Sequence, residues 1–213
     1  MTISRRQFVG GGVCVAAGFI APGAAVAPPT LTPATPVPPP KAPPQHLPPA
    51  ASQALDAMAR HQSRLVHRDR IAVADYGVHS GETRFHLLNV EQGRIEASYL
   101  VSHGRGSDPA NTGFVERFSN RPGSNASSAG SFLTGDTYHG KHGRSRRLHG
   151  LDPENDLAFE RAIVIHGADY VERSMAQMQG RVGRSLGCFA FEQSKIGEIL
   201  DRLGPGRLLF STK

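Results

Sequence analysis

The sequence predicts one mainly β domain, arranged as a sandwich or a partly open barrel with a few short helices. Short runs rich in β-branched and aromatic residues recur along the chain, and turns that contain glycine separate them. Only two stretches place apolar residues at helical spacing, and the chain has no internal repeat. The 213 residues are enough for one sizeable domain with its own core.

The domain is expected to span residues 52–213 and to open with a helix. Ser52 can cap this helix, and Leu55, Met58 and Leu65 follow it at helical spacing. The pattern then changes to three β-prone runs, which are Ile71–Tyr76, Arg84–Val90 and Ile95–Ser102.

Residues 104–131 are rich in Gly, Ser and Asn, so we expect a long ordered loop or an irregular layer there. Lys195–Leu203 is expected to form the second helix, with Ser194 as its cap and Gly204 as its end. Further strands are expected over Leu148–Leu151, Ala162–His166 and Arg207–Ser211.

Residues 1–27 are predicted to be a twin-arginine-type signal peptide and not a part of the fold. The run S-R-R-Q-F-V that starts at Ser4 resembles the twin-arginine motif, and Ala25 and Ala27 offer the small residues that a signal peptidase needs. The apolar region between them is shorter than the roughly 20 residues of a spanning helix, so no membrane span is expected after cleavage. An uncleaved anchor is the alternative. We therefore expect export by the twin-arginine route to the periplasm.

Residues 28–51 are predicted to be an extended, proline-rich linker. Twelve of the 16 prolines lie between Pro22 and Pro49. Each proline fixes φ and removes a hydrogen-bond donor, which excludes a helix interior or a central strand.

The formal net charge of the chain is +6, which suits an anionic surface such as a bacterial wall or a nucleic acid. The chain has no Trp and only 4 Tyr and 10 Phe with which to stack on bases. We therefore expect no nucleic-acid partner. The composition leaves the oligomeric state open.

The cysteines indicate a reactive thiol. Cys14 lies within the predicted signal peptide, so Cys188 would be the single thiol of the mature chain. Secreted proteins normally pair their cysteines. An unpaired one forms an intermolecular bridge or is a thiol kept free for chemistry.

His166 is the candidate base for a Cys188 nucleophile. A thiol with a pKa of about 8.5 needs a lowered pKa or a base to attack at neutral pH. The far nitrogen of His166 would need an acceptor, and a backbone carbonyl could serve. Gly187 allows a sharp turn, after which the amides of Gly187 and Cys188 are expected to face a developing oxyanion. The alternative is a packed core cysteine and a structural histidine.

Several segments of the domain keep fixed spacings of distinctive residues, among them I-V-I-H-G at Ile163–Gly167 and G-R-S-x-G-C at Gly183–Cys188. Taken together, they resemble the murein L,D-transpeptidase catalytic domain family, and the resemblance covers nearly all of residues 52–211. The other segments that carry it are Tyr99–Gly104, Phe118–Phe132, Tyr138–Leu151 and Asn155–Val171.

The resemblance implies a β-sandwich-like catalytic domain that acts on peptidoglycan stem peptides. Cys188 would attack the carbonyl between the diamino residue of a stem tetrapeptide and its terminal D-alanine, with His166 as the general base. D-alanine leaves, a thioester forms, and an amine of another stem resolves it. Ser185, Gly187 and Gly167 would support the nucleophile turn and the oxyanion hole.

Two positions depart from the wider family and leave the acceptor open. Leu186 stands where the wider family has a histidine, and Phe189-Ala190 replaces an apolar residue followed by Asn or Arg. The alternatives are therefore an L,D-carboxypeptidase with water as acceptor, or a catalytically silent peptidoglycan-binding domain. A papain-like amidase is disfavoured, because its cysteine precedes its histidine in the chain.

A basic segment, Tyr138–Arg147, is the candidate wall of the substrate site. Arg147, or Arg184 in the nucleophile turn, is expected to pair with stem carboxylates, while Tyr138 or His142 lines the cleft. The alternative is an ordinary solvated loop.

We expect neither a cofactor nor a metal. His139, His142 and His166 could converge, but no H-E-x-x-H motif or paired-cysteine spacing accompanies them. Gly140-Lys141 lacks the other glycines of a phosphate-binding loop.

Overall fold

The computed structural model describes residues 47–213, and the structural statements below concern these residues. The predicted signal peptide, the predicted linker up to residue 46 and Cys14 lie outside them. No helix within residues 47–213 is long and apolar enough to cross a membrane.

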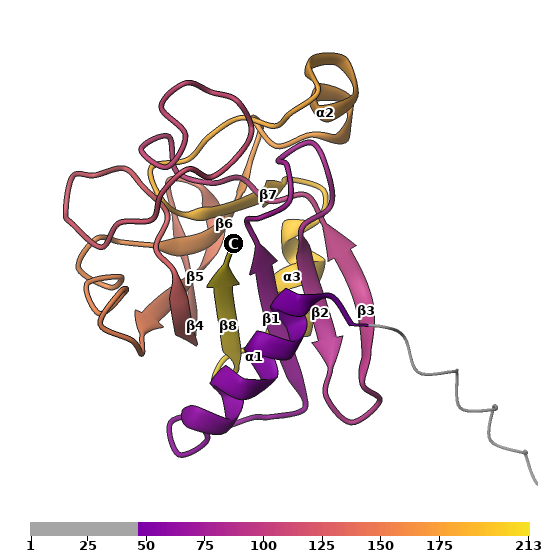
Figure 1. The fold of residues 1–213 in the computed structure, drawn as a ribbon, viewed down its shortest axis with the longest axis vertical. Coiled ribbons are helices and arrows are strands. Elements are labelled where there is room, and N and C mark those ends of the chain that lie inside the picture. Colours follow the sequence, from indigo (N-terminus) through magenta and orange to yellow (C-terminus); the bar gives the residue numbers. More distant parts are fainter. Residues whose placement is uncertain (1–46) are drawn as a thin grey trace, which may run out of the picture. The chain divides into compact units, whose positions relative to one another are not determined.

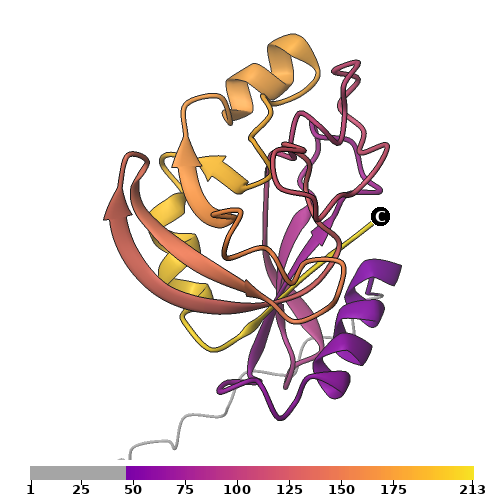
Figure 2. The same cartoon turned by 90° about the vertical axis from the view of Figure 1, so that its left-hand side faces the viewer.

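Eight strands form one mixed sheet in the order β3-β2-β1-β8-β4-β5-β6-β7 (Figure 1). The sheet is not closed, since β3 and β7 are its two edges, and Figure 2 shows the long β4–β5 pair curving strongly. The predicted mainly β class is confirmed, in the form of one open, curved sheet. The strands are β1 Arg70–Asp75, β2 Phe85–Asn89, β3 Arg94–Tyr99, β4 Gly130–Gly140, β5 Gly143–Gly150, β6 Val164–Ala168, β7 Phe189–Glu192 and β8 Leu208–Thr212.

Three short helices accompany the sheet: α1 Pro49–Arg60, α2 Arg173–Gln179 and α3 Ile196–Leu203. The alanine face of α1 packs on β1 and β8, in a cluster with Ile71 and Phe210. The apolar face of α3 joins the main core on the opposite side of the sheet (Figure 1). Burial of these two apolar faces explains why both helices form at their places in the chain.

Both predicted helices exist, but their predicted caps are wrong. Helix α1 begins at Pro49 with Pro48 at the cap position, so Ser52 lies inside the helix. Proline suits the first helical turn, because its missing N–H would have no partner there. The last residues of the predicted linker therefore belong to α1. Lys195, and not Ser194, precedes α3 and makes no side-chain cap.

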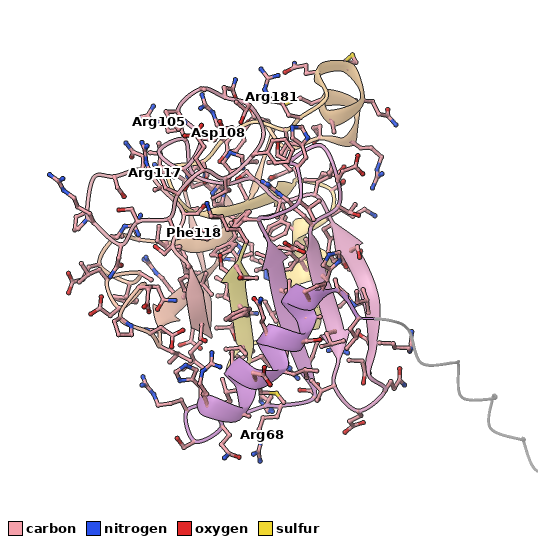
Figure 3. All side chains as sticks on the ribbon, viewed as in Figure 1. Arg68, Arg105, Asp108, Arg117, Phe118 and Arg181 are labelled. Carbon is pink, nitrogen blue, oxygen red and sulfur yellow. The ribbon has the colours of Figure 1, made fainter. Side chains whose placement is uncertain are left out.

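The predicted strands are present with shifted ends, and β4, β7 and α2 were not predicted. Between β3 and β4 the described chain holds no strand or helix beyond a single bridge that joins Gly104 to Ser185. The expected long ordered loop over residues 104–131 is confirmed up to the start of β4. Figure 3 shows Arg105 and Arg117 of this segment on its outer side, and both are exposed.

Candidate active site

The parallel neighbours β6 and β7 bring the predicted nucleophile and base together. His166 lies in the middle of β6, and Cys188 directly precedes β7. The register pairs Ile165 with Phe189, which places Cys188 beside the amino-terminal part of β6. Both side chains line one cleft of about 440 Å³. The fold thus brings two residues that are far apart in the sequence to the same cleft.

The imidazole of His166 is held in one tautomer. Its Nδ1 lies 2.9 Å from the carbonyl oxygen of Gly167, which can only accept, so Nδ1 carries the proton. Nε2 is then left with its lone pair, as a general base requires. Burial lowers the pKa of His166, and the charge of Lys141 acts in the same direction. The expectation that a backbone carbonyl would orient the base is confirmed.

His142 stacks on the base. The centroids of the His142 and His166 rings are 4.2 Å apart, with 26° between the ring planes. Burial lowers the pKa of His142, and Lys141 next to it lowers that pKa further. Two neutral rings can stack in this way, whereas two imidazolium ions would repel each other.

Cys188 is the free thiol of the described chain, and it is half-buried. Its S–H donates to the carbonyl oxygen of Ala162 at 3.5 Å. Burial raises the pKa of Cys188, and the Val164 backbone, Arg161 and Lys141 lower it by smaller amounts. In the resting site, a thiol bonded to Ala162 and a neutral imidazole therefore line the same cleft. Attack by sulfur requires His166 to take the proton as the new bond forms.

Ser185 closes the nucleophile turn with two hydrogen bonds. Its hydroxyl donates to the carbonyl oxygen of Cys188 at 2.7 Å and accepts from the amide of Gly187 at 3.1 Å. Gly187 has φ 115°, and a Cβ there would lie 2.6 Å from the carbonyl oxygen of Ala126. Glycine is therefore required at this position.

The same hydrogen bonds correct the expected oxyanion hole. The Gly187 amide is already bonded to Ser185, so it is not free for an oxyanion. The Cys188 amide donates to no acceptor among the turn and loop hydrogen bonds of residues 47–213. Gly167 supports the base through its carbonyl, and its lack of a side chain admits the Gln193 amide group. The turn thus offers one oxyanion donor where two were expected.

The four predicted substrate residues divide into two groups. Tyr138, His142 and Arg184 line the cleft, whereas Arg147 does not. The guanidinium carbon of Arg147 lies 4.2 Å from the centre of the Tyr138 ring, so Arg147 supports the wall from outside. Arg184 also donates to the carbonyl oxygen of Asp108.

A buried polar cluster of Arg84, His103 and Asp108 supports the nucleophile turn on the side away from the cleft. The Ser185 amide donates to the carbonyl oxygen of His103 at 2.9 Å. The His103 ring lies 2.7 Å from an Arg84 nitrogen through Nδ1 and 3.2 Å from Asp108 through Nε2. Burial, with the charge of Arg84, lowers the pKa of His103 to about 4, so the ring is neutral and accepts from Arg84. A rigid support of this kind keeps a catalytic group in place.

Five residues of the cleft were not singled out from the sequence: Lys141, Arg161, Ala162, Val164 and Tyr170. Lys141 was named only within a rejected phosphate loop, although it lies in the basic segment Tyr138–Arg147 that was predicted to form the wall of the substrate site. Arg161 was only a position in a family segment. These residues come together only in the folded chain, so no local sequence pattern predicts that they share a cleft. The structure brings no three His, Cys, Asp or Glu side chains of residues 47–213 into a metal-holding group.

A family model described as L,D-transpeptidase catalytic domain matches residues 44–212, and these include Cys188 and His166. No match was found among curated proteins.

Solved structures of L,D-transpeptidases are similar to this chain at low sequence identity. One from Mycobacterium smegmatis is 13% identical, with a TM-score of 0.42, and the match covers 68% of this chain and 59% of that one. L,D-transpeptidase 3 from Mycobacterium tuberculosis is 11% identical, with a TM-score of 0.44 and coverage of 68% and 61%. One from Xylanimonas cellulosilytica is 17% identical, with a TM-score of 0.39 and coverage of 75% and 69%. The chain thus spans about three fifths of the mycobacterial structures.

Proposed function

The chain belongs to the L,D-transpeptidase catalytic domain family, and from this membership we propose that it is a cysteine acyltransferase of peptidoglycan stem peptides. The observation that carries the mechanism is the cleft shared by Cys188 and His166, in which the base has its Nε2 lone pair free. The alternative of a silent binding domain does not explain why a half-buried thiol and an oriented imidazole line the same cleft.

In the first half-reaction, the sulfur of Cys188 bonds to the carbonyl carbon before the terminal D-alanine, and its proton moves to His166 Nε2. The carbonyl oxygen becomes an oxyanion, to which the Cys188 amide donates. The carbon–nitrogen bond then breaks, and His166 returns the proton to the departing amine of D-alanine. A thioester on Cys188 and free D-alanine result.

In the second half-reaction, an amine of a neighbouring stem attacks the thioester, and His166 accepts its proton. The carbon–sulfur bond breaks, and the thiol is restored with the proton from His166. Leu186, whose side chain is 56% exposed at the cleft, presents an apolar surface where the wider family has an ionisable group. An acceptor that enters the cleft would therefore meet this apolar surface instead of a second histidine.

The cations of the cleft support a peptide substrate that carries carboxylates. Lys141 and Arg184 line the same cleft as the nucleophile, and Tyr138 forms part of its wall. A guanidinium or ammonium group makes strong, charge-assisted hydrogen bonds to a carboxylate. We place the enzyme in the periplasm, on the strength of the twin-arginine motif at Arg5 and Arg6.

The proposed function is tested by incubating the purified domain with a disaccharide-tetrapeptide and separating the products by mass spectrometry. Cross-linked dimer together with free D-alanine supports transpeptidation. Release of D-alanine with tripeptide alone supports the carboxypeptidase alternative. If neither product exceeds that of Cys188→Ala, the enzyme hypothesis is wrong.

A further inference from the structure

Arg161 is a cation bonded only to neutral groups. Its terminal nitrogens donate to the carbonyl oxygens of Ser119 at 2.7 Å and Ala126 at 2.6 Å. They also donate to the hydroxyl oxygens of Ser128 at 2.5 Å and Ser124 at 3.4 Å. No carboxylate of residues 47–213 forms an ion pair with Arg161. Its positive charge is therefore uncompensated at short range.

Arg161 also lies at the nucleophile turn. One of its nitrogens would be 3.3 Å from a Cβ placed on Gly187, the residue before the nucleophile. Its chain neighbour Ala162 accepts the thiol hydrogen of Cys188, and the Arg161 side chain lines the same cleft as Cys188. The arginine thus joins the irregular segment 119–128 to the turn that carries the sulfur.

The charge of Arg161 acts on the sulfur at the step when sulfur becomes negative. Buried surroundings disfavour a thiolate, and a nearby cation favours it. Burial raises the pKa of Cys188, while Arg161 is among the groups that lower it. Burial lowers the pKa of Arg161, and Cys188 opposes this lowering, so the effect is reciprocal. A half-buried cation without a counter-ion is screened less than a surface charge.

We propose that Arg161 is a positioning residue that holds segment 119–128 against the nucleophile turn and supplies the positive charge that stabilises the Cys188 thiolate as it forms. The inference rests on the proposed nucleophile. Arg161 keeps its proton throughout, and the thiol proton goes to His166. The planar guanidinium suits this double task, because its fork reaches several oxygens at once while the charge stays fixed.

The test follows alkylation of Cys188 by iodoacetamide as a function of pH, which reports thiolate formation without substrate turnover. In Arg161→Gln, we expect the midpoint of the profile to move to higher pH by about one unit, which makes alkylation roughly tenfold slower at neutral pH. Arg161→Lys retains the charge, so the midpoint of its alkylation profile is expected to stay closer to that of the parent protein. Thermal unfolding of each variant reports whether the fold is intact.

A second variant keeps the charge argument testable if Arg161→Gln does not fold. Ser124→Asp places a carboxylate beside Arg161 and compensates its charge, whereas Ser124→Asn is its neutral control. We expect the midpoint to rise in the Asp variant and to stay in place in the Asn variant. Equal midpoints in folded Ser124→Asp, Ser124→Asn and parent protein would overturn the proposal. If these shifts appear but muropeptides stay unprocessed, the proposed function fails alone.

Discussion

The rings of His142 and His166 stack with their centroids 4.2 Å apart. His142 comes from the turn between β4 and β5, and His166 lies on the next strand of the sheet. The hydrogen bond from Nδ1 to Gly167 fixes one edge of the base, while the stack fixes its face. The orientation of Nε2 thus depends on a segment remote from the nucleophile turn.

Replacement of His142 tests this support. A stacking pair contributes about 0.5–1.5 kcal/mol. The family resemblance implies that Cys188 is acylated by carbapenems such as imipenem, and His142→Ala is expected to slow this acylation by roughly 2- to 10-fold. His142→Phe keeps a flat ring and is expected to retain most of the rate. The measurement is the rate of loss of imipenem absorbance under single-turnover conditions. Equal rates for the Ala and Phe variants would show that the stack does not position the base.

The pH dependence of the same reaction follows from the lowered pKa of His166. Protonation of the base stops acylation, and burial keeps the base neutral to lower pH than a free imidazole. The midpoint of the acid limb of the rate profile is therefore expected at a pH below the ordinary histidine pKa of about 6.5. Lys141→Gln removes a charge that lowers this pKa, so it should move the acid limb upward. An acid limb above the ordinary value contradicts this account of His166.

Gly187 is expected to tolerate no side chain. In Gly187→Ala, the positive φ costs about 1–3 kcal/mol, and the new Cβ also meets the carbonyl oxygen of Ala126. Gly197, in α3, has open space around it, so Gly197→Ala is expected to stabilise the domain by about 0.5–1 kcal/mol. Urea unfolding of both variants gives the comparison. A Gly187→Ala protein as stable as the parent rules out the strained turn.

Ser185 is expected to contribute to stability as well as to activity. Ser185→Ala leaves the Gly187 amide and the Cys188 carbonyl without their partner, which costs about 1–3 kcal/mol. The matched control is Ser211→Ala, because the buried hydroxyl of Ser211 has no hydrogen-bond partner within the described chain. This control is expected to leave the free energy of unfolding nearly unchanged. Equal losses of unfolding free energy in the two variants, measured by chemical unfolding, would mean that the two hydrogen bonds of Ser185 do not stabilise the domain.

Local patterns in the sequence were enough to predict the domain class and to select the two residues, Cys188 and His166, that the fold brings to one cleft. β-Branched and aromatic runs lie where β1, β2 and β6 form, because side-chain packing on a sheet follows local composition. His166 ends an apolar run and Cys188 follows a glycine, so each has a local signal.

Features that depend on long-range contacts could not be predicted in this way. Strand β4 holds three glycines and is partly exposed, and its neighbours β5 and β8 pair with a segment that has little strand propensity of its own. The commitment of the Gly187 amide to Ser185 is a matter of turn geometry that no spacing reveals. The role of Arg161 depends on oxygens more than 30 residues away in the chain.

Intact-protein mass spectrometry with imipenem tests whether Cys188 is the nucleophile and His166 its base. We expect one adduct per chain, located on Cys188 by peptide mapping. The adduct should be absent in Cys188→Ala and should form much more slowly in folded His166→Ala. An adduct that persists in Cys188→Ala, or an unmodified folded parent protein, would contradict this assignment.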